Sequence, residues 1–340
     1  MAKKLLIITQ KVDREDQLLG FFVEWLKEFA KHYDHIIVFC LERDNFDLPD
    51  NIRVISLGKD RKEPKFLWLW NFYANYWRLR REYDSVFVHM NPIWAVLGST
   101  MWRIMHKKVV LWYTHKAVTL KLRIAEKVVS QIVTASPESF RIKSNKVLVV
   151  GHGIDTDLFC PDEAKKSSDG IIRILSVGRI APIKGYETLI DAATILKNSG
   201  VVFSVTVIGE PAVKDDINYL ESLKLTIKSR GLTNAITFVG KVVNRNLPAY
   251  YQSHNIFVHM SQTGSLDKSI LEAMACGTKV VSSNDASRVF LPKELTFSAN
   301  DGKDLAEKIL VANKVNFDGR QYVIDRHSLP RLISTLSSIL

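Results

Sequence analysis

Short apolar runs alternate with segments of helical apolar spacing along the whole chain, and this alternation restricts the possible folds more than any other feature. Lys4–Thr9 and Ile36–Cys40 are two such runs, and Leu18–His32 is the helical segment between them. Short apolar runs separated by helices are typical of strands that are buried on both faces of a parallel sheet. An α/β protein is therefore expected.

The alternation continues toward the C-terminal end of the chain. Further strands are expected at Ile52–Leu57, Val86–His89, Val109–Tyr113, Gln131–Thr134, Val147–Val150, Ile174–Val177, Phe203–Ile208, Ile236–Val239, Ile256–His259 and Lys279–Ser282. Further helices are expected at Phe66–Tyr83, Tyr186–Asn198, Asp216–Ser229, Ser269–Ala275, Asp304–Ala312 and Ser328–Ile339.

The length of 340 residues fits two domains of about 150 to 200 residues each. The stretch from Gly151 to Gly170 is rich in Gly, Pro, Asp and Ser, which is typical of a linker between domains. We therefore expect two doubly wound, Rossmann-like domains, one over residues 1–150 and one over residues 151–321.

Composition excludes several other classes of protein. With 46% hydrophobic and 24% charged residues, the chain is neither disordered nor collagen-like. No apolar run approaches the roughly 20 residues that cross a bilayer, and the N-terminus does not read as a signal peptide. Cys40, Cys160 and Cys276 show neither metal-ligand nor disulfide spacing, so a cytoplasmic location is expected.

The net charge of +11 is concentrated in one part of the chain. Residues 51–150 carry 18 basic and 6 acidic side chains, whereas residues 151–340 carry 22 and 20. A basic region attracts nucleic acid, an anionic membrane surface or a phosphorylated ligand, and it can equally be a solvated face. Charge alone does not choose among these possibilities.

The segment Ser176–Gly185 places two basic residues at the end of an expected strand. Gly178 ends that strand, Arg179 and Lys184 lie in the loop, and a helix is expected near Gly185. Ligands of open α/β sheets bind just past the carboxyl ends of the strands. An arginine, a lysine and a helix N-terminus together suit a diphosphate. The alternative is an exposed turn with two basic residues, and the order of residues is not that of a Walker loop.

A second candidate segment runs from Thr263 to Gly277. Its Gly/Ser/Asp loop leads into a short helix, and Glu272 is expected in the first turn of that helix. A carboxylate there can accept hydrogen bonds from both hydroxyls of a ribose. The alternative is a glutamate that only favours the helix dipole. Cys276 is expected to be a buried structural thiol.

Together with Gly151–Phe159, these two segments resemble the retaining glycosyltransferases of the GT-B fold, in the group-one (family four) class. The resemblance covers residues 145–285 and extends more loosely to Leu19-Gly20 and Trp112–His115. It implies two Rossmann-like domains that face a cleft, an acceptor-side domain followed by a donor-binding domain. It also implies that residues 322–340 cross back onto the first domain.

The resemblance further implies roles for individual residues. Arg179 and Lys184 would bind the diphosphate of a UDP- or GDP-linked sugar, the only small molecule implied, with no tightly bound cofactor. Glu272 would bind the ribose, and His115 would face the transferred sugar unless it is a strand-end histidine held by hydrogen bonds. Structural roles are favoured for His89 and His152. The other donor-binding candidates are Gly20, Gly178, Lys241, Val242, Gly264, Ser265, Leu266, Asp267, Ser269, Ile270 and Leu271.

One position departs from the pattern of the family. Gly264 stands where the family has the first glutamate of its Glu-x7-Glu segment, and Asp267, three residues later, is the candidate substitute. The departure puts the sugar specificity in doubt more than the nucleotide site. No Asp-x-Asp pair stands at a strand end, so transfer without a divalent metal is expected.

Residues 59–83 mix aromatic and basic side chains. Phe66, Trp70, Tyr73 and Trp77 fall on one helical face, which is expected to pack on the core, whereas Trp68 and Phe72 lie off it. Aromatic residues beside arginines also suit a membrane interface. The basic region 51–150 is therefore expected to meet either an anionic membrane surface or a phosphate-linked acceptor, the alternative being a core with a solvated face.

These features favour a glycosyltransferase that moves a sugar from a nucleotide-sugar to an acceptor hydroxyl with retention, in cell-envelope polysaccharide or glycolipid synthesis. A catalytically inactive nucleotide-sugar binder and a GT-B epimerase or phosphorylase remain as alternatives. Gly264 argues against an epimerase, which needs carboxylates near the sugar. A nucleic-acid-binding protein is disfavoured because zinc spacings and RNA-binding aromatic motifs are lacking.

Overall fold

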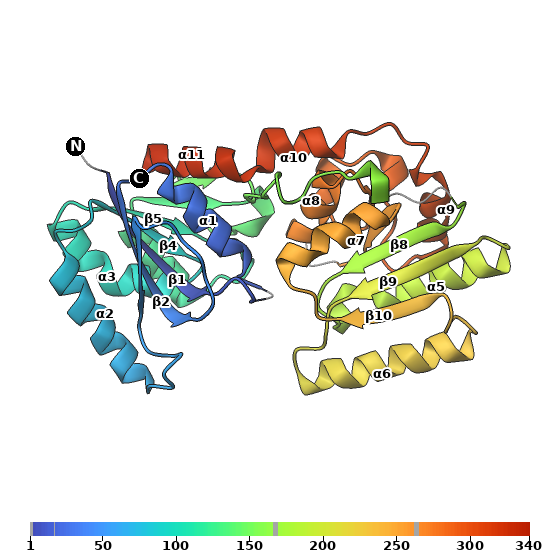
Figure 1. Ribbon diagram of the computed structural model, residues 1–340, viewed down its shortest axis with the longest axis horizontal. Coiled ribbons are helices and arrows are strands. Elements are labelled where there is room, and N and C mark those ends of the chain that lie inside the picture. The colour runs from blue at the N-terminus through green and yellow to red at the C-terminus, as the bar shows by residue number, and fades with distance from the viewer. Residues whose placement is uncertain (1–2, 17, 166–168, 262–264) are drawn as a thin grey trace. The chain divides into compact units, whose positions relative to one another are not determined.

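The computed structural model describes residues 3–16, 18–165, 169–261 and 265–340. The chain divides into two compact units (Figure 1). The first unit combines residues 1–155 with 326–340, and the second comprises residues 156–325. Each unit has its own parallel sheet, so each is described by itself.

The first unit is built on a seven-stranded parallel sheet in the order β3-β2-β1-β4-β5-β6-β7. The order reverses between β1 and β4, which makes the unit doubly wound. The strands are β1 (Lys4–Val12), β2 (His35–Arg43), β3 (Ile52–Ser56), β4 (Ser85–His89), β5 (Lys108–Trp112), β6 (Gln131–Thr134) and β7 (Val147–Val149).

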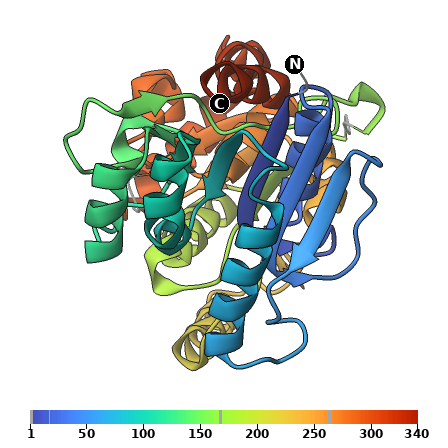
Figure 2. The same ribbon diagram turned by 90° about the vertical axis from the view of Figure 1, so that its left-hand side faces the viewer.

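Helices cover both faces of this sheet (Figure 2). Alternate residues of a strand point to opposite faces, so Leu6 and Ile8 join one apolar core while Leu5 and Ile7 join the other. The first core is covered by α2 (Lys65–Leu79), α3 (Pro92–Ile104) and α4 (Leu120–Val128), and the second by α1 (Phe21–Ala30) and α11 (Leu329–Ile339).

The second unit has a five-stranded parallel sheet in the order β10-β9-β8-β11-β12, which reverses between β8 and β11. Its strands are β8 (Ile172–Val177), β9 (Phe203–Ile208), β10 (Ile236–Gly240), β11 (Ile256–His259) and β12 (Lys279–Ser282). Its helices are α5 (Tyr186–Asn198), α6 (Lys214–Ser229), α7 (Leu247–Ser253), α8 (Lys268–Ala275) and α9 (Gly302–Ala312), and α10 (Gly319–His327) spans the boundary to the first unit.

Every strand expected from the sequence is present, whereas α3, α4, α7 and α10 were not expected. Helix α3 is apolar on several sides, so its sequence shows no single stripe, and α4 buries only Leu122 and Ala125. Helix α7 has seven residues and a proline at its second position, and α10 has no apolar stripe. A hydrophobic stripe is the main sequence signal of a helix. Helix α10 lacks it, and α7 is too short to display one.

Helix α2 buries the face opposite to the one expected. Phe72, Tyr76 and Leu79 are at most 2% exposed, and Trp68 packs partly buried against the same core. The expectation that the other aromatic stripe would face the core is therefore wrong. A helical stripe predicts that a face is apolar, and α2 has two apolar faces. The outward residues are Phe66 (70% exposed), Trp70 (71%), Tyr73 (42%) and Trp77 (54%).

Helix α11 completes the core next to α1. Ile154 pairs with Ser328 as an isolated bridge, and the indole of Trp25 donates to the carbonyl of Gly153 at 3.1 Å. Gly153 has a φ of +66°, and a Cβ there would lie 2.4 Å from Leu332 Cδ2. Only glycine fits this crossing without moving α11.

The buried imidazole of His327 should make stability depend on pH. Burial, with a smaller contribution from Arg326, lowers its pKa from 6.5 to about 4. Because the unfolded chain then binds the proton more tightly, stability is complete above pH 6.5 and falls toward pH 4. The loss is about 1.4 kcal/mol for each pH unit at most. Urea unfolding across this range should show a flatter slope for His327→Gln than for the wild type.

His32→Gln, which changes a half-buried histidine after α1, is the matched control and should keep the wild-type slope. An identical slope in His327→Gln and wild type would show that His327 does not control this pH dependence.

Candidate functional site

The candidate residues of the second unit gather where its strand order reverses. Strands β8 and β11 are neighbours, and they end at Val177 and His259. The loop after β8 leads to β9 and the loop after β11 leads to β12. These two strands lie toward opposite edges of the sheet, so the two loops diverge. Ligands of doubly wound sheets bind at such a point, past the carboxyl ends of the strands.

The loop after β8 is held by backbone contacts. The amide of Gly178 donates to the carbonyl of Ile208 at 2.9 Å, and the hydroxyl of Tyr186 donates to the carbonyl of Gly178 at 3.1 Å. Residues Pro182–Lys184 form a single 3-10 turn, and Gly185, with a φ of +68°, leads into α5. The loop therefore presents Arg179 and Lys184 from a fixed backbone.

Lys184, His259 and Asp267 form the most tightly connected cluster of the site. One carboxylate oxygen of Asp267 lies 2.6 Å from Lys184 Nζ and 2.8 Å from His259 Nε2. His259 is 4% exposed, and its Nδ1 has no hydrogen-bond partner within the described residues. Asp267 precedes the first residue of α8, yet its side chain caps no helix amide. The carboxylate is committed to the lysine and the histidine instead.

The charges of this cluster stabilise the ionised carboxylate of Asp267. Burial alone would raise its pKa, but the hydrogen bond and charge of His259, with those of Lys184, outweigh burial and hold the pKa well below its ordinary value. Asp267 is therefore an anion throughout the physiological range. It faces Lys184, one of the two cations expected to meet a diphosphate.

Glu272 lies deeper in α8 than the sequence suggested. The helix begins at Lys268 and has no acidic residue in its first turn, so the expected first-turn position of Glu272 is wrong. The carboxylate instead accepts from Asn244 Nδ2 at 3.2 Å and from the hydroxyl of Tyr251 at 3.1 Å. These two donors, rather than free helix amides, orient it.

Glu272 is also a buried acid. Burial raises its pKa, although Lys268, Asn244 and Tyr251 oppose the shift, and burial lowers the pKa of Lys268 to about 7. Glu272 follows Asp267 by five residues, which is about 7.5 Å along a helix axis.

The other expected residues of this unit occupy varied positions. Arg179 is exposed, with Nε 3.9 Å from Asp216 Oδ2, and Lys241 and Val242 follow the end of β10. The side chains of Leu266, Ile270 and Leu271 are buried, so only their backbones can meet a ligand. Ser265 and Ser269 are half-buried. Gly264 lies outside the described residues.

Sequence reasoning missed several polar residues that position the site. Asn284, fully buried, donates from Nδ2 to the carbonyls of Ser261 at 3.3 Å and Ser265 at 3.0 Å, and so holds both ends of the loop after β11. His259, Asn244 and Tyr251 were also missed. Only His259 carried a signal, because it ends a strand next to the switch point.

The candidates of the first unit lie past the carboxyl ends of its own strands. His115 is exposed after β5, and its Nδ1 accepts from the amide of Ala117 at 3.0 Å. Gly20 precedes α1, and a Cβ there would lie 2.5 Å from the carbonyl of Asp16. His89 is buried, stacked on Phe22, with Nδ1 3.1 Å from Thr9 Oγ1.

His152 belongs to the first unit and packs at the crossing of the chain. It is buried, and its amide donates to His327 Nδ1 at 3.3 Å. The geometry fits the structural role favoured for His152 and His89 more closely than contact with a substrate.

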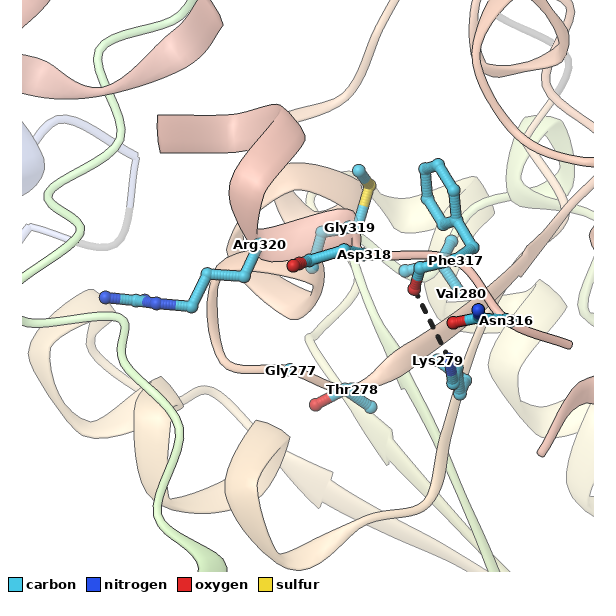
Figure 3. A pocket seen from close by; sticks show the side chains of 10 residues that line it. Gly277, Thr278, Lys279, Val280, Asn316, Phe317, Asp318, Gly319 and Arg320 are labelled. Carbon is cyan, nitrogen blue, oxygen red and sulfur yellow. Dashed lines mark hydrogen bonds between the residues drawn. The ribbon is translucent and has the colours of Figure 1, made fainter. Parts of the chain in front are cut away.

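A pocket of about 300 Å³ in the second unit lies away from this site (Figure 3). It adjoins Lys279, the first residue of β12, and is thus at the amino end of the sheet. Lys279 Nζ donates to the carbonyls of Val315 at 2.9 Å and Phe317 at 3.3 Å, and Arg320 donates to that of Ala275 at 2.6 Å. Lys279 and Arg320, the cations that line this pocket, therefore bind backbone carbonyls of the chain.

Comparison with known proteins identifies the class of the second unit. Residues 162–314 match the family described as glycosyl transferases group 1. This part of the chain is similar to that family, and the resemblance seen in the motifs is confirmed.

Two curated relatives each match less than half of the chain. Mannosylfructose-phosphate synthase of Agrobacterium fabrum is 29% identical over 155 residues, which are 42% of this chain and 34% of the relative. D-inositol 3-phosphate glycosyltransferase of Paenarthrobacter aurescens is 30% identical over 148 residues, 41% of this chain and 35% of the relative. The match thus spans about a third of the length of these relatives.

A solved structure extends the likeness to both units. Anabaena HepE, crystallised with UDP and glucose, covers 99% of this chain and 98% of its own, with a TM-score of 0.75 and 17% identity. At this identity the likeness concerns the fold. The expected fold class, two doubly wound α/β domains of the GT-B type, is confirmed.

The loop after β8 should depend on Gly209. Gly209 has a φ of +141°, and a Cβ there would lie 1.9 Å from the carbonyl oxygen of Gly178. Gly209→Ala should lower the free energy of unfolding by about 1 to 3 kcal/mol, because the added methyl displaces the loop backbone. Urea unfolding measures this loss.

Gly200→Ala is the matched control. Gly200 also has a positive φ, +73°, but its Cβ would meet nothing within 4 Å. It should lose about 1 kcal/mol from backbone strain alone. Equal losses in the two variants would contradict the steric role of Gly209.

Proposed function

We propose that the protein is a retaining glycosyltransferase, which moves a sugar from a UDP- or GDP-linked donor to an acceptor hydroxyl. The observation that carries the proposal is the joint position of Lys184, Asp267 and Glu272 at the switch point of a group 1 domain. The loop with Arg179 and Lys184 supplies cations for a diphosphate, and α8 supplies a buried carboxylate for a ribose. Anabaena HepE, which shares the fold, was crystallised with UDP and glucose, which supports a nucleotide-sugar donor.

The charge arrangement supports a mechanism in which the leaving group is stabilised. Cleavage of the anomeric carbon–oxygen bond leaves a nucleoside diphosphate with growing negative charge. Arg179 is exposed and its guanidinium can form two parallel hydrogen bonds, and Lys184 adds a second cation from the same loop. Cations held in place before the reaction stabilise such charge without reorganisation.

Lys184 must exchange one anion for another during donor binding. Its ammonium is bound to Asp267 at 2.6 Å, so a diphosphate at this point displaces or joins the carboxylate. Once released, Asp267 stays fixed to His259 and can accept a hydroxyl of the donor sugar. It thereby substitutes for the glutamate that Gly264 replaces.

Asn244, Tyr251 and Glu272 would form the ribose end of the site. The two donors leave each oxygen of the buried Glu272 with a further lone pair for a hydroxyl. The residues after β10, Lys241 and Val242, would meet the base.

We propose that the basic residues replace a divalent metal. Within the described residues, no three His, Cys, Asp or Glu side chains form a metal site.

The first unit, to which residues 326–340 belong, would take the acceptor. His115 lies exposed past the end of β5 and would face the transferred sugar, with its Nδ1 already accepting from the backbone. Gly20 is retained as a donor-binding candidate, and its lack of a side chain lets the carbonyl of Asp16 approach closely. The acceptor would be a carbohydrate or a lipid-linked molecule of the cell envelope, used on the cytoplasmic face of the membrane.

A catalytically inactive nucleotide-sugar binder is the second candidate function. One observation favours it. Asp267, the carboxylate that could replace the family glutamate missing at Gly264, is already paired with Lys184 and His259. Transfer or hydrolysis of UDP- and GDP-sugars separates the two functions, because an inactive binder forms the complex without releasing the diphosphate.

Arg179→Ala and Lys184→Ala should each reduce turnover strongly, by about 100-fold or more, because each removes a cation from the leaving group. Release of UDP or GDP from the donor is the measurement. Lys224→Ala, which removes an exposed lysine from α6, should leave turnover unchanged. Normal turnover in both site variants would refute the assignment of the diphosphate site.

Asp267→Asn should separate donor binding from transfer. The neutral amide no longer competes for Lys184, so calorimetry should show tighter binding of the free nucleoside diphosphate. Transfer should fall, because the carboxylate proposed to hold the sugar is lost. Weaker binding of the diphosphate together with unchanged transfer would contradict both roles of Asp267.

A further inference from the structure

Helix α2 exposes an aromatic surface that its own fold leaves uncovered. Phe66, Trp70, Tyr73 and Trp77 follow one another at helical spacing on its outer side, and three of them are more than half exposed. They extend over about 17 Å of helix. No charged residue occurs from Phe66 through Trp77. Such a continuous apolar patch marks an interaction surface rather than an ordinary solvated helix.

The core does not include Phe66, Trp70 and Trp77, whereas the hydroxyl of Tyr73 donates to the carbonyl of Leu97 on α3 at 3.2 Å. Phe72, Tyr76 and Leu79 already fix the helix to the sheet from the opposite side, and Phe72 lies 4.9 Å from the ring of Trp94 on α3. The two apolar faces of α2 therefore have separate roles, one in packing and one turned to the solvent.

Cations without acidic partners stand at both ends of the aromatic surface. Lys62 and Lys65 precede it, and Arg78, Arg80 and Arg81 follow it. Within the described residues, none of these five side chains forms an ion pair with a carboxylate, in contrast to Lys59, which pairs with Glu42. Arg80 lies over the ring of Trp77, with Cζ 4.3 Å from the ring centroid.

The first unit also has a basic pocket of about 480 Å³, lined by residues of α3, α4, β5 and the loops next to them. Lys107, which lines it, donates from Nζ to the carbonyl of Tyr83, four residues after the end of α2. The pocket opens at the amino ends of β5 and β6 and is lined by no acidic side chain. Its basic residues are Arg103, His106, Lys107, Lys108, Lys127 and Lys146.

Part of that basic charge is available to a ligand. Lys146 Nζ donates to the carbonyls of Glu126 at 2.8 Å and Val129 at 3.0 Å and thus caps α4. Arg103, Lys108 and Lys127 are exposed and, in the part of the chain that the structure describes, have no ion pair.

We infer that the outer side of α2 docks on an anionic lipid bilayer, with the aromatic rings at the headgroup level and the flanking cations on lipid phosphates. Tryptophan and tyrosine favour this interface because their rings are apolar and their N–H and O–H groups stay hydrated. Cations next to an amphipathic surface add attraction to anionic lipids. No helix in the described ranges is long and apolar enough to cross a membrane, so the contact would be peripheral.

Vesicle flotation tests this inference on the full chain. The protein should float with phosphatidylcholine vesicles that contain phosphatidylglycerol, and much less with phosphatidylcholine alone or at high salt. The double variant Trp70→Ser/Trp77→Ser should weaken binding by about tenfold or more, because it removes the two most extensive exposed rings. Arg78→Gln/Arg81→Gln should weaken binding to anionic vesicles only.

Helix α6 of the second unit supplies matched controls. Ile217→Ser/Leu225→Ser removes two exposed apolar side chains, which are 53% and 69% exposed, and Lys214→Gln/Lys228→Gln removes two exposed cations. Both control variants should bind vesicles like the wild type. Equal losses in the α2 and α6 variants would overturn the inference.

Tryptophan fluorescence gives a second readout. Trp70 and Trp77 are more than half exposed, whereas Trp25, Trp94, Trp102 and Trp112 are buried. Anionic vesicles should shift the emission to the blue in the wild type but not in Trp70→Phe/Trp77→Phe. Thermal melting checks that the variants fold, which is expected because the substituted side chains lie outside the core.

Two further outcomes would overturn the inference. One is the absence of binding to anionic vesicles. The other is a wild-type dimer that the Trp70→Ser/Trp77→Ser change converts to monomer without any vesicle binding, which would assign the surface to a second copy of the chain. Neither assay contains a sugar donor, so failure here is distinguishable from failure of the proposed transferase activity.

Discussion

The burial of both faces of each parallel sheet is the constraint on which the structure depends. Strands covered on two sides must be apolar throughout, so their polar chemistry can appear only where they end. In the second unit, β8 and β11 end side by side while their loops depart in opposite directions. Lys184 from one loop and Asp267 from the other therefore meet at the same edge.

Asp267 connects the two loops of the candidate site chemically. Its carboxylate joins the loop after β8, through Lys184, to the last residue of β11, His259. The family pattern has a glutamate three residues earlier, where Gly264 stands in this chain. In the proposed function Asp267 takes over the sugar contact of that glutamate, so one negative charge is moved by three residues along the same segment.

The sequence was sufficient for the strands and for the loop with Arg179 and Lys184, because two-sided burial leaves uninterrupted apolar runs and the loop follows one directly. It was insufficient for α2, since a helix with two apolar faces gives no sign of which one meets the sheet. It also misplaced Glu272, because α8 begins at Lys268, one residue before the expected Ser269, and Glu272 therefore lies beyond the first turn. Asn284 could not be recognised, since its partners are carbonyls brought near only by folding.

The carboxylate of Asp267 also has a consequence for the salt dependence of the candidate site. Lys184 carries its own counter-ion there, so the site has less need to recruit an anion from solution. Binding of a diphosphate then replaces one fixed anion by another and releases few buffer ions. The part of the affinity that Lys184 supplies should therefore vary less with ionic strength than attraction between exposed cations and a charged surface. Added salt should then weaken the proposed membrane contact of α2 more than the contact of Lys184 with a donor.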